Sequence, residues 1–215
     1  MLHPHVPDTL KHFGKHLLAT FLGLLMALGL EQWREHRHDA KVASEALRAV
    51  DAEMAENLDR ARTQIARCEA SLKSLSEVEA RLAAMAEARK KGTLPDESPL
   101  AVNTGVALDF VPDAWDAFKA QGLLRFLPQE RTRRLSRFHR MARALPEMAR
   151  LNFSGGDAFM VLASRLTESP AAWAKLPAPE FDRFRDGVRL TRLYFTWSQS
   201  QLTNLESAGL EALKP

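Results

Sequence analysis

The sequence predicts an all-α protein in which an N-terminal transmembrane helix continues into a long helix and the C-terminal half folds back as an antiparallel helical bundle. Three observations indicate this class. Ala, Leu, Arg and Glu dominate the composition while Val, Ile and Tyr are scarce, which favours helix over sheet. An uninterrupted apolar run lies near the N-terminus, at residues 17–30. Residues 39–90 contain no proline or glycine, and apolar residues recur there every three or four positions.

The composition is that of a folded chain with few options for metal or disulfide chemistry. Of the 215 residues, 46% are hydrophobic and only 10 are glycine, which argues against disorder over the whole chain. The single cysteine, Cys68, excludes an internal disulfide framework and a cysteine-based zinc site. A net charge of +3 is too small to indicate a nucleic-acid partner by itself, and none is expected.

The first element after a tail of residues 1–12 is a membrane anchor at residues 13–33. The apolar run alone has 14 residues, which is fewer than the roughly 20 that a spanning helix needs. The flanking residues extend it, because Lys15 can reach the headgroups with its long side chain and Trp33 suits the membrane interface. The 21 residues from 13 to 33 then span about 31 Å as a helix.

Two other interpretations of this segment stay open at the level of sequence. A cleaved export signal would end near the small residues of Ala27-Leu28-Gly29, and a soluble core helix would bury the apolar run. Helical composition continues through Glu31 without a breaker, which favours an uncleaved anchor. Basic residues on the two sides of the run nearly balance, so they predict no orientation and leave the side of the soluble domain undetermined.

Small residues spaced four apart give the anchor a face on which a second helix could approach closely. Ala19, Gly23 and Ala27 form this candidate span-packing face. The spacing is also common by chance in alanine-rich helices, so self-association of the span is one possibility among several.

The second element is a long amphipathic helix at residues 34–91. Its apolar seam includes Leu47, Val50 and Met54, followed by an extra four-residue step to Leu58 that resembles a stutter in a heptad repeat. The seam then continues through Ala61, Ile65, Cys68, Leu72, Leu75 and Leu82. Such a seam serves either an antiparallel bundle within one chain or a coiled coil between chains.

The second half, residues 112–215, follows a loop at 92–111 and predicts three or more helices. The first begins near Pro112 and ends at Gly122, and the second begins near Pro128. The second carries the stripe Leu135, Phe138, Ala142 and Leu145. A final helix after Pro179 repeats apolar residues at heptad-like steps, namely Phe181, Phe184, Val188, Phe195, Leu202 and Leu205, and is the expected partner of the long helix.

An arginine-rich stretch is the best candidate docking surface. Residues 125–150 hold eight arginines against two glutamates, and Arg133, Arg137 and Arg140 represent the candidate docking face. Such a face suits an acidic partner or anionic lipid. Alternatively, the acidic residues at 44–80 pair with these arginines inside the fold.

No catalytic or metal-binding pattern stands out. His36 and His38 are two residues apart, which places their side chains on different faces of a helix, so they cannot share one ion. No cofactor is expected. We therefore expect a non-enzymatic, membrane-tethered interaction or scaffold protein. A sensor with a ligand pocket around Trp115, Trp173 and Trp197 is the first alternative, and an enzyme is the second.

Two segments resemble those of a family of uncharacterised bacterial single-span membrane proteins. The first is Glu31-Gln-Trp33-Arg-Glu35-His-Arg37, which is similar to the family's acid/amide-x-Trp-x-acid-x-Arg signature after the anchor. The second, residues 114–124, is similar to an aromatic-Lys-x-x-Gly-x-Leu segment. The resemblance covers about a quarter of the chain. It implies a bacterial cell-membrane protein with one span and a helical domain, and it implies no activity.

Overall fold

The protein is all-α in a computed structural model that describes residues 8–93, 108–152, 173 and 175–214. Helix α1 spans Asp8–Lys90, α2 spans Asp113–Ala120, the short 3-10 helix η1 spans Leu123–Phe126, α3 spans Gln129–Asn152 and α6 spans Ala178–Leu213. The described residues include no strand. The predicted fold class is therefore confirmed.

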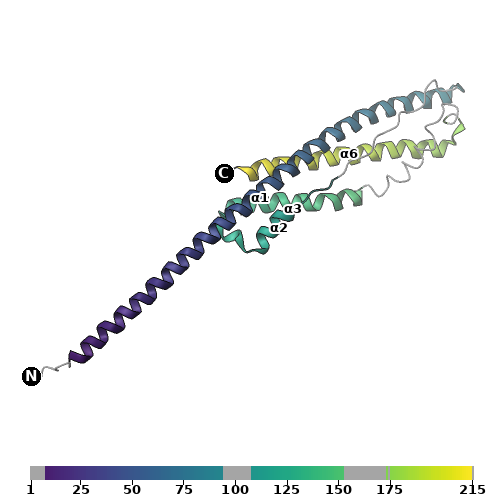
Figure 1. The fold of residues 1–215 in the computed structure, drawn as a ribbon. Helices are drawn as coiled ribbons and strands as arrows, with labels where there is room; N and C mark the ends of the chain where they lie inside the picture. The colour runs from purple at the N-terminus through teal and green to yellow at the C-terminus, as the bar shows by residue number, and fades with distance from the viewer. Residues whose placement is uncertain (1–7, 94–107, 153–172, 174, 215) are drawn as a thin grey trace, which may run out of the picture.

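Helix α1 is one continuous helix with two different environments. Its N-terminal part projects from the molecule as a lone rod, whereas its C-terminal part lies along α6 (Figure 1). Residues 16–38 are all exposed, and Ala43 is the first residue of α1 to be buried. The apolar run therefore lies outside the bundle. This agrees with the predicted arrangement, in which one helix continues from the apolar segment into the bundle.

The C-terminal part of α1 packs along α6 as an antiparallel pair (Figure 1). Two ion pairs define the direction, since Arg62 pairs with Glu206 and Glu79 pairs with Arg192, so numbers rise on α1 as they fall on α6. The buried residues of α6 follow alternating steps of three and four, which is the spacing of a heptad seam. They are Phe181, Phe184, Val188, Thr191, Phe195, Ser198, Leu202, Leu205, Gly209 and Ala212, and Ala208 is buried next to Gly209. The antiparallel partner predicted for the long helix is thus found within the same chain.

The seam of α1 contains a regular heptad pattern and also Leu58, the residue to which the predicted extra four-residue step leads. Eleven buried residues from Val50 to Met85 alternate in steps of three and four, and Leu58 is buried next to one of them, Asn57. The positions are Val50, Met54, Asn57, Ala61, Gln64, Cys68, Ser71, Leu75, Val78, Leu82 and Met85. The sequence pattern did not reveal the heptad positions of Asn57, Gln64 and Ser71, because these residues are polar. The apolar residues Ile65 and Leu72, which were expected on the seam, are half-buried next to it.

Helix α3 completes the core beside α1 and α6. Its predicted stripe, Leu135, Phe138, Ala142 and Leu145, is buried. The three helices meet at Gly209, where an added Cβ would lie 2.5 Å from Leu58 Cδ2 and 2.9 Å from Phe138 Cε2. Phe138 of α3 is therefore level with Leu58 of α1, and the ion pair between Arg131 and Asp51 shows that these two helices run in the same direction.

A sharp turn joins α2 to α3 through η1. Gly122 has φ of +69°, a left-handed conformation that suits glycine and ends α2 as the sequence predicted. At the other end of α2, Asp113 and Asp116 lie in the first turn, where they complement the helix dipole. The turn places η1 at the end of the bundle from which the α1 rod projects (Figure 1).

Candidate functional site

The anchor candidate is the exposed N-terminal part of α1. By length and composition, one described helix is able to cross a membrane, and none of its apolar window is buried in the bundle. Trp33 is exposed at the end of this window, with the guanidinium of Arg37 4.9 Å from the centre of its ring. Lys15 belongs to α1, but its side chain lies outside the described part.

The small residues of the candidate span-packing face are open on this rod. Ala19, Gly23 and Ala27 are all exposed, and a Cβ built on Gly23 meets no atom within 4 Å. No described part of this chain occupies the face. Its role in packing a second span stays a prediction.

The bundle begins immediately beyond the anchor. The ring of Phe126 in η1 lies 5.5 Å from the ring of His36, and Arg125 donates a hydrogen bond of 2.6 Å to Asp39. At 1.5 Å per residue, His36 and Asp39 lie about 4.5 Å and about 9 Å beyond Trp33 along α1. No stalk therefore separates the apolar window from the folded domain.

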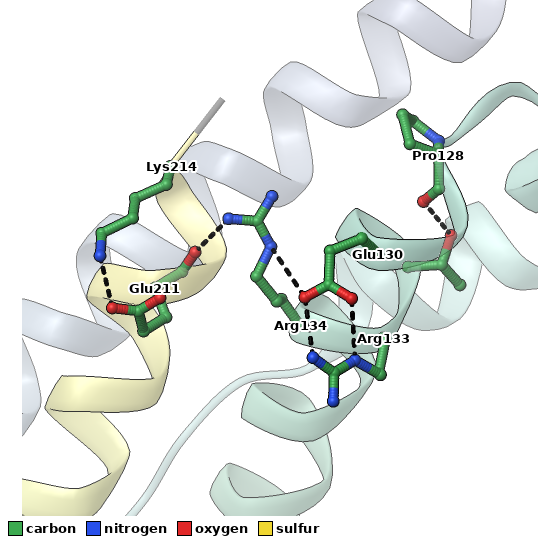
Figure 2. Close-up of polar contacts among 7 residues, drawn as sticks. Pro128, Glu130, Arg133, Arg134, Glu211 and Lys214 are labelled. Atoms are coloured by element: carbon green, nitrogen blue, oxygen red, sulfur yellow. Dashed lines mark hydrogen bonds and ion pairs between the residues drawn. The ribbon is translucent and has the colours of Figure 1, made fainter.

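The arginine-rich stretch is largely engaged inside the fold. Arg125, Arg131 and Arg143 pair with acids on other elements, which are Asp39, Asp51 and Asp116 respectively. Within α3, Arg133 pairs with Glu130 and Arg150 pairs with Glu147. Arg134 donates to the main-chain oxygen of Glu211 on α6, as Figure 2 shows. Intramolecular pairing thus accounts for much of this charge, but among the described residues only the pair of Arg131 with Asp51 joins the stretch to the acidic residues at 44–80 that were expected to be its partners.

The candidate docking face retains free charge at two of its three arginines. Arg137 and Arg140 are exposed and have no ion-pair partner among the described residues. Arg133 is also exposed, but both of its bonds go to Glu130, one turn before it in α3 (Figure 2). Glu130 raises the pKa of the Arg133 guanidinium, which is fully charged in any case. The free part of the face is therefore Arg137 with Arg140.

The register of α3 against α1 fixes the height of this face above the anchor. Arg131 is level with Asp51 and Phe138 with Leu58, so the arginines of the face lie beside residues about 20 to 27 positions after Trp33. That corresponds to about 30 to 40 Å along the helix. Charges in solution are largely screened beyond about 8 Å at physiological ionic strength. At this height the face is remote from a membrane surface at Trp33.

A buried polar clamp, which sequence reasoning missed, holds the start of α2 on α1. Asn57 is 1% exposed and exchanges two hydrogen bonds with the main chain of Val111, at 2.7 and 3.2 Å. One turn earlier, Glu53 Oε2 accepts a hydrogen bond of 2.6 Å from the amide of Ala114. Burial raises the pKa of Glu53, and the amides of Ala114 and Trp115 oppose that shift. The signal in the sequence was Asn57, a polar residue at a seam position where the spacing predicts an apolar one.

His139 of α3 closes the clamp from the other side. It is 2% exposed, and its ring stacks on Trp115 with centres 5.4 Å apart. Its Nδ1 atom is 3.9 Å from Glu53 Oε1, which is too long for a hydrogen bond. Burial lowers the pKa of His139 to about 4, so the ring is neutral at physiological pH and this contact is not an ion pair. The clamp is a structural joint of three helices.

The three tryptophans proposed for a ligand pocket do not converge. Trp115 is buried beside Glu53, whereas Trp173 is buried at the far end of the bundle, where Arg89 donates to its main-chain oxygen. Residues 53 and 89 of α1 are about 54 Å apart along the helix. Trp197 is half-buried between these ends. The described residues therefore offer no shared pocket at these side chains.

A groove at the distal end of the α1–α6 pair has a volume of about 540 Å³. Its lining is Glu79, Leu82, Ala83, Ala86, Glu87, Lys90, Arg185 and Arg189. Acids and bases alternate around it, and Glu87 pairs with Lys90 while Glu79 pairs with Arg192. The groove therefore has no dominant charge that would select a ligand.

The described residues contain no group of three side chains suited to hold a metal ion. Cys68 is fully buried on the α1 seam, and burial raises its pKa to about 11. A thiol in that state is neutral at physiological pH and a poor nucleophile. Cys68 therefore serves as a core residue, as the sequence indicated.

Comparisons with known proteins identify no relative: no family model, no curated protein and no solved structure matches the chain. The resemblance to a family of single-span bacterial proteins stays a prediction.

Proposed function

We propose that the protein is a single-span bacterial membrane protein whose helical bundle acts as a non-enzymatic interaction or scaffold domain. The observation that carries this proposal is the exposed apolar part of α1. Its large apolar side chains are between 48% and 76% exposed. They are Leu17, Leu18, Phe21, Leu22, Leu24, Leu25, Met26, Leu28, Leu30 and Trp33. A soluble monomer rarely exposes so long an apolar surface, and a bilayer would bury it.

The unbroken helix supports an uncleaved anchor over a cleaved signal. Backbone hydrogen bonds of α1 continue from the apolar window into the buried seam, with no loop at Ala27-Leu28-Gly29. Cleavage there would remove the rod but leave the bundle. The continuous helix gives the domain a fixed attachment, which suits a scaffold that presents a surface at a set height.

The arginine face supports an acidic protein partner. Arg137 and Arg140 are exposed, lack intramolecular ion pairs among the described residues, and lie about 36 to 40 Å above Trp33 by helix rise. Anionic lipid is disfavoured as the partner of this face because that height exceeds the screening length several-fold. We propose that the partner is another membrane or envelope protein with an acidic surface, or a second copy of this chain.

A charge reversal tests the docking role. Full-length protein carrying Arg137→Glu and Arg140→Glu should lose the partners that the parent chain co-purifies from detergent-solubilised membranes, while its unfolding midpoint stays unchanged. The control is Arg67→Glu with Arg183→Glu, which makes the same change in net charge at two exposed positions on α1 and α6. Equal loss of partners in both variants would attribute binding to net charge and contradict a specific face.

A sensor role is the weaker proposal. It needs a ligand pocket, and the tryptophans expected to line one are spread along the bundle. The residues of the polar clamp are engaged with the backbone at the start of α2 or with an aromatic ring, so they offer no open ligand site.

A further inference from the structure

Residues 121–127, named here the membrane-proximal corner, form the turn between α2 and α3. The corner has the sequence Gln-Gly-Leu-Leu-Arg-Phe-Leu and includes no acidic residue. It is the part of the bundle that reaches furthest toward the free rod of α1 (Figure 1). Phe126 and Leu127 in it are half-buried, and Arg125 is exposed.

Two contacts attach the corner to α1 just beyond the anchor. Phe126 packs against His36 with ring centres 5.5 Å apart, and Arg125 bonds to Asp39 at 2.6 Å. The guanidinium of Arg125 also lies 4.9 Å from the centre of the Phe126 ring. The corner is therefore held at the level of the first two turns of α1 after Trp33.

That level coincides with the headgroup layer of a bilayer. The headgroups add roughly 5 to 8 Å on each side of the hydrocarbon core. With Trp33 at the edge of the hydrocarbon, His36 lies about 4.5 Å and Asp39 about 9 Å beyond it. A helix tilt of about 20° shortens these heights by less than a tenth.

The chemistry of the surrounding side chains suits phospholipid headgroups. Arg34 and Arg37 on α1 join Arg125 as guanidinium groups, which bind phosphate oxygens through several donors. Asp39, on the same stretch of α1, is already paired with Arg125. Aromatic and aliphatic side chains beside arginine are the residue types enriched at the membrane interface.

From the geometry we infer that the membrane-proximal corner rests in the phospholipid headgroup layer and forms a second contact of the domain with the bilayer, in addition to the span. This inference depends on the proposed function, because it needs α1 to cross the membrane. The two contacts together fix the tilt and rotation of the bundle. The span and the corner therefore set the direction in which the arginine face points, about 30 Å further from the membrane than the corner.

Depth measurements with nitroxide labels test the inference on the full chain. Three single-cysteine variants are made with Cys68→Ala: Gln121→Cys at the corner, Ser207→Cys on the exposed side of α6, and Leu24→Cys within the apolar window. Each labelled protein is reconstituted in vesicles of phosphatidylcholine and phosphatidylglycerol. Collision rates with oxygen and with a water-soluble nickel chelate are compared by electron paramagnetic resonance.

The expected result is an ordered series of depths. The label at residue 24 should favour oxygen, the label at 207 should favour the nickel chelate, and the label at 121 should read at the phosphate level. A label at 121 as accessible to nickel as that at 207, with residue 24 in hydrocarbon, would overturn the headgroup contact and leave the anchor standing. A label at 24 that is accessible to nickel would overturn the anchor and the inference with it.

Discussion

Gly209 offers the most direct mutational test of the helical core, because α1, α3 and α6 meet there. In Gly209→Val, the added Cβ would lie 2.5 Å from Leu58 Cδ2 and 2.9 Å from Phe138 Cε2, both shorter than ordinary carbon contacts. Overpacking of this kind lowers the free energy of unfolding by about 1 to 3 kcal/mol. The two methyl groups of Val need still more space, so we expect a cost near the upper end of that range. Val has a higher helix propensity than Gly, which raises the free energy of unfolding by about 0.5 kcal/mol. We expect a net loss of about 2 to 3 kcal/mol.

Urea unfolding of the full chain in detergent micelles, followed by far-ultraviolet circular dichroism, measures this loss. Ser207→Val is the matched control, since residue 207 is exposed two positions earlier in the same helix. It should change the free energy of unfolding by no more than about 0.5 kcal/mol. If Gly209→Val were as stable as the control, α3 and α1 would not meet α6 at this residue and the packing argument would be refuted.

Three further predictions concern buried polar groups. His139 has a pKa of about 4 in the folded chain and about 6.5 when unfolded, so its contribution to stability is complete above pH 6.5 and is lost as the pH falls toward 4. Between pH 7 and pH 4 the parent should therefore lose about 2 to 3 kcal/mol more of its free energy of unfolding than His139→Phe, as measured from unfolding curves at the two pH values. An equal pH dependence in both proteins would contradict a buried neutral ring. Asn57→Leu should cost about 2 kcal/mol by leaving the main chain of Val111 unpaired, and should shift the fluorescence of Trp115; an unchanged unfolding midpoint would mean that the clamp adds nothing. The thiol of Cys68, whose pKa is raised to about 11, should resist maleimide at pH 7.5 until urea is added, and rapid labelling of the native chain would contradict its burial on the seam.

Much of the architecture was accessible from sequence because periodicity and helix breakers are local signals. Gly122 and Pro128 bound their helices where expected, and the stripe on α3 is buried as predicted. The antiparallel pairing of α1 with α6 was also predictable, since each helix carries a long apolar seam and neither has another partner of similar length.

The positions that sequence did not predict are the polar ones. Asn57, Gln64 and Ser71 occupy core positions on α1, and their polarity concealed a regular heptad pattern. A residue such as Asn57 is tolerated there because its two hydrogen bonds go to Val111, which is 54 residues away in sequence. Such a partner is set by the tertiary fold and leaves no local pattern. The height of the arginine face likewise depended on the register of α3 against α1.

The central claim is that α1 crosses the membrane uncleaved, with the bundle on one side of it. The most direct measurement uses Thr9→Cys and Ser207→Cys, one variant before and one after the apolar window, each with Cys68→Ala. A membrane-impermeant maleimide is applied to intact spheroplasts and to lysed ones, and the full-length chain is followed through a carbonate-washed membrane pellet. The account predicts that one position labels before lysis and the other only after it, with the full-length chain in the pellet. Labelling of both positions from the same side, or a shortened chain in the supernatant, would contradict it.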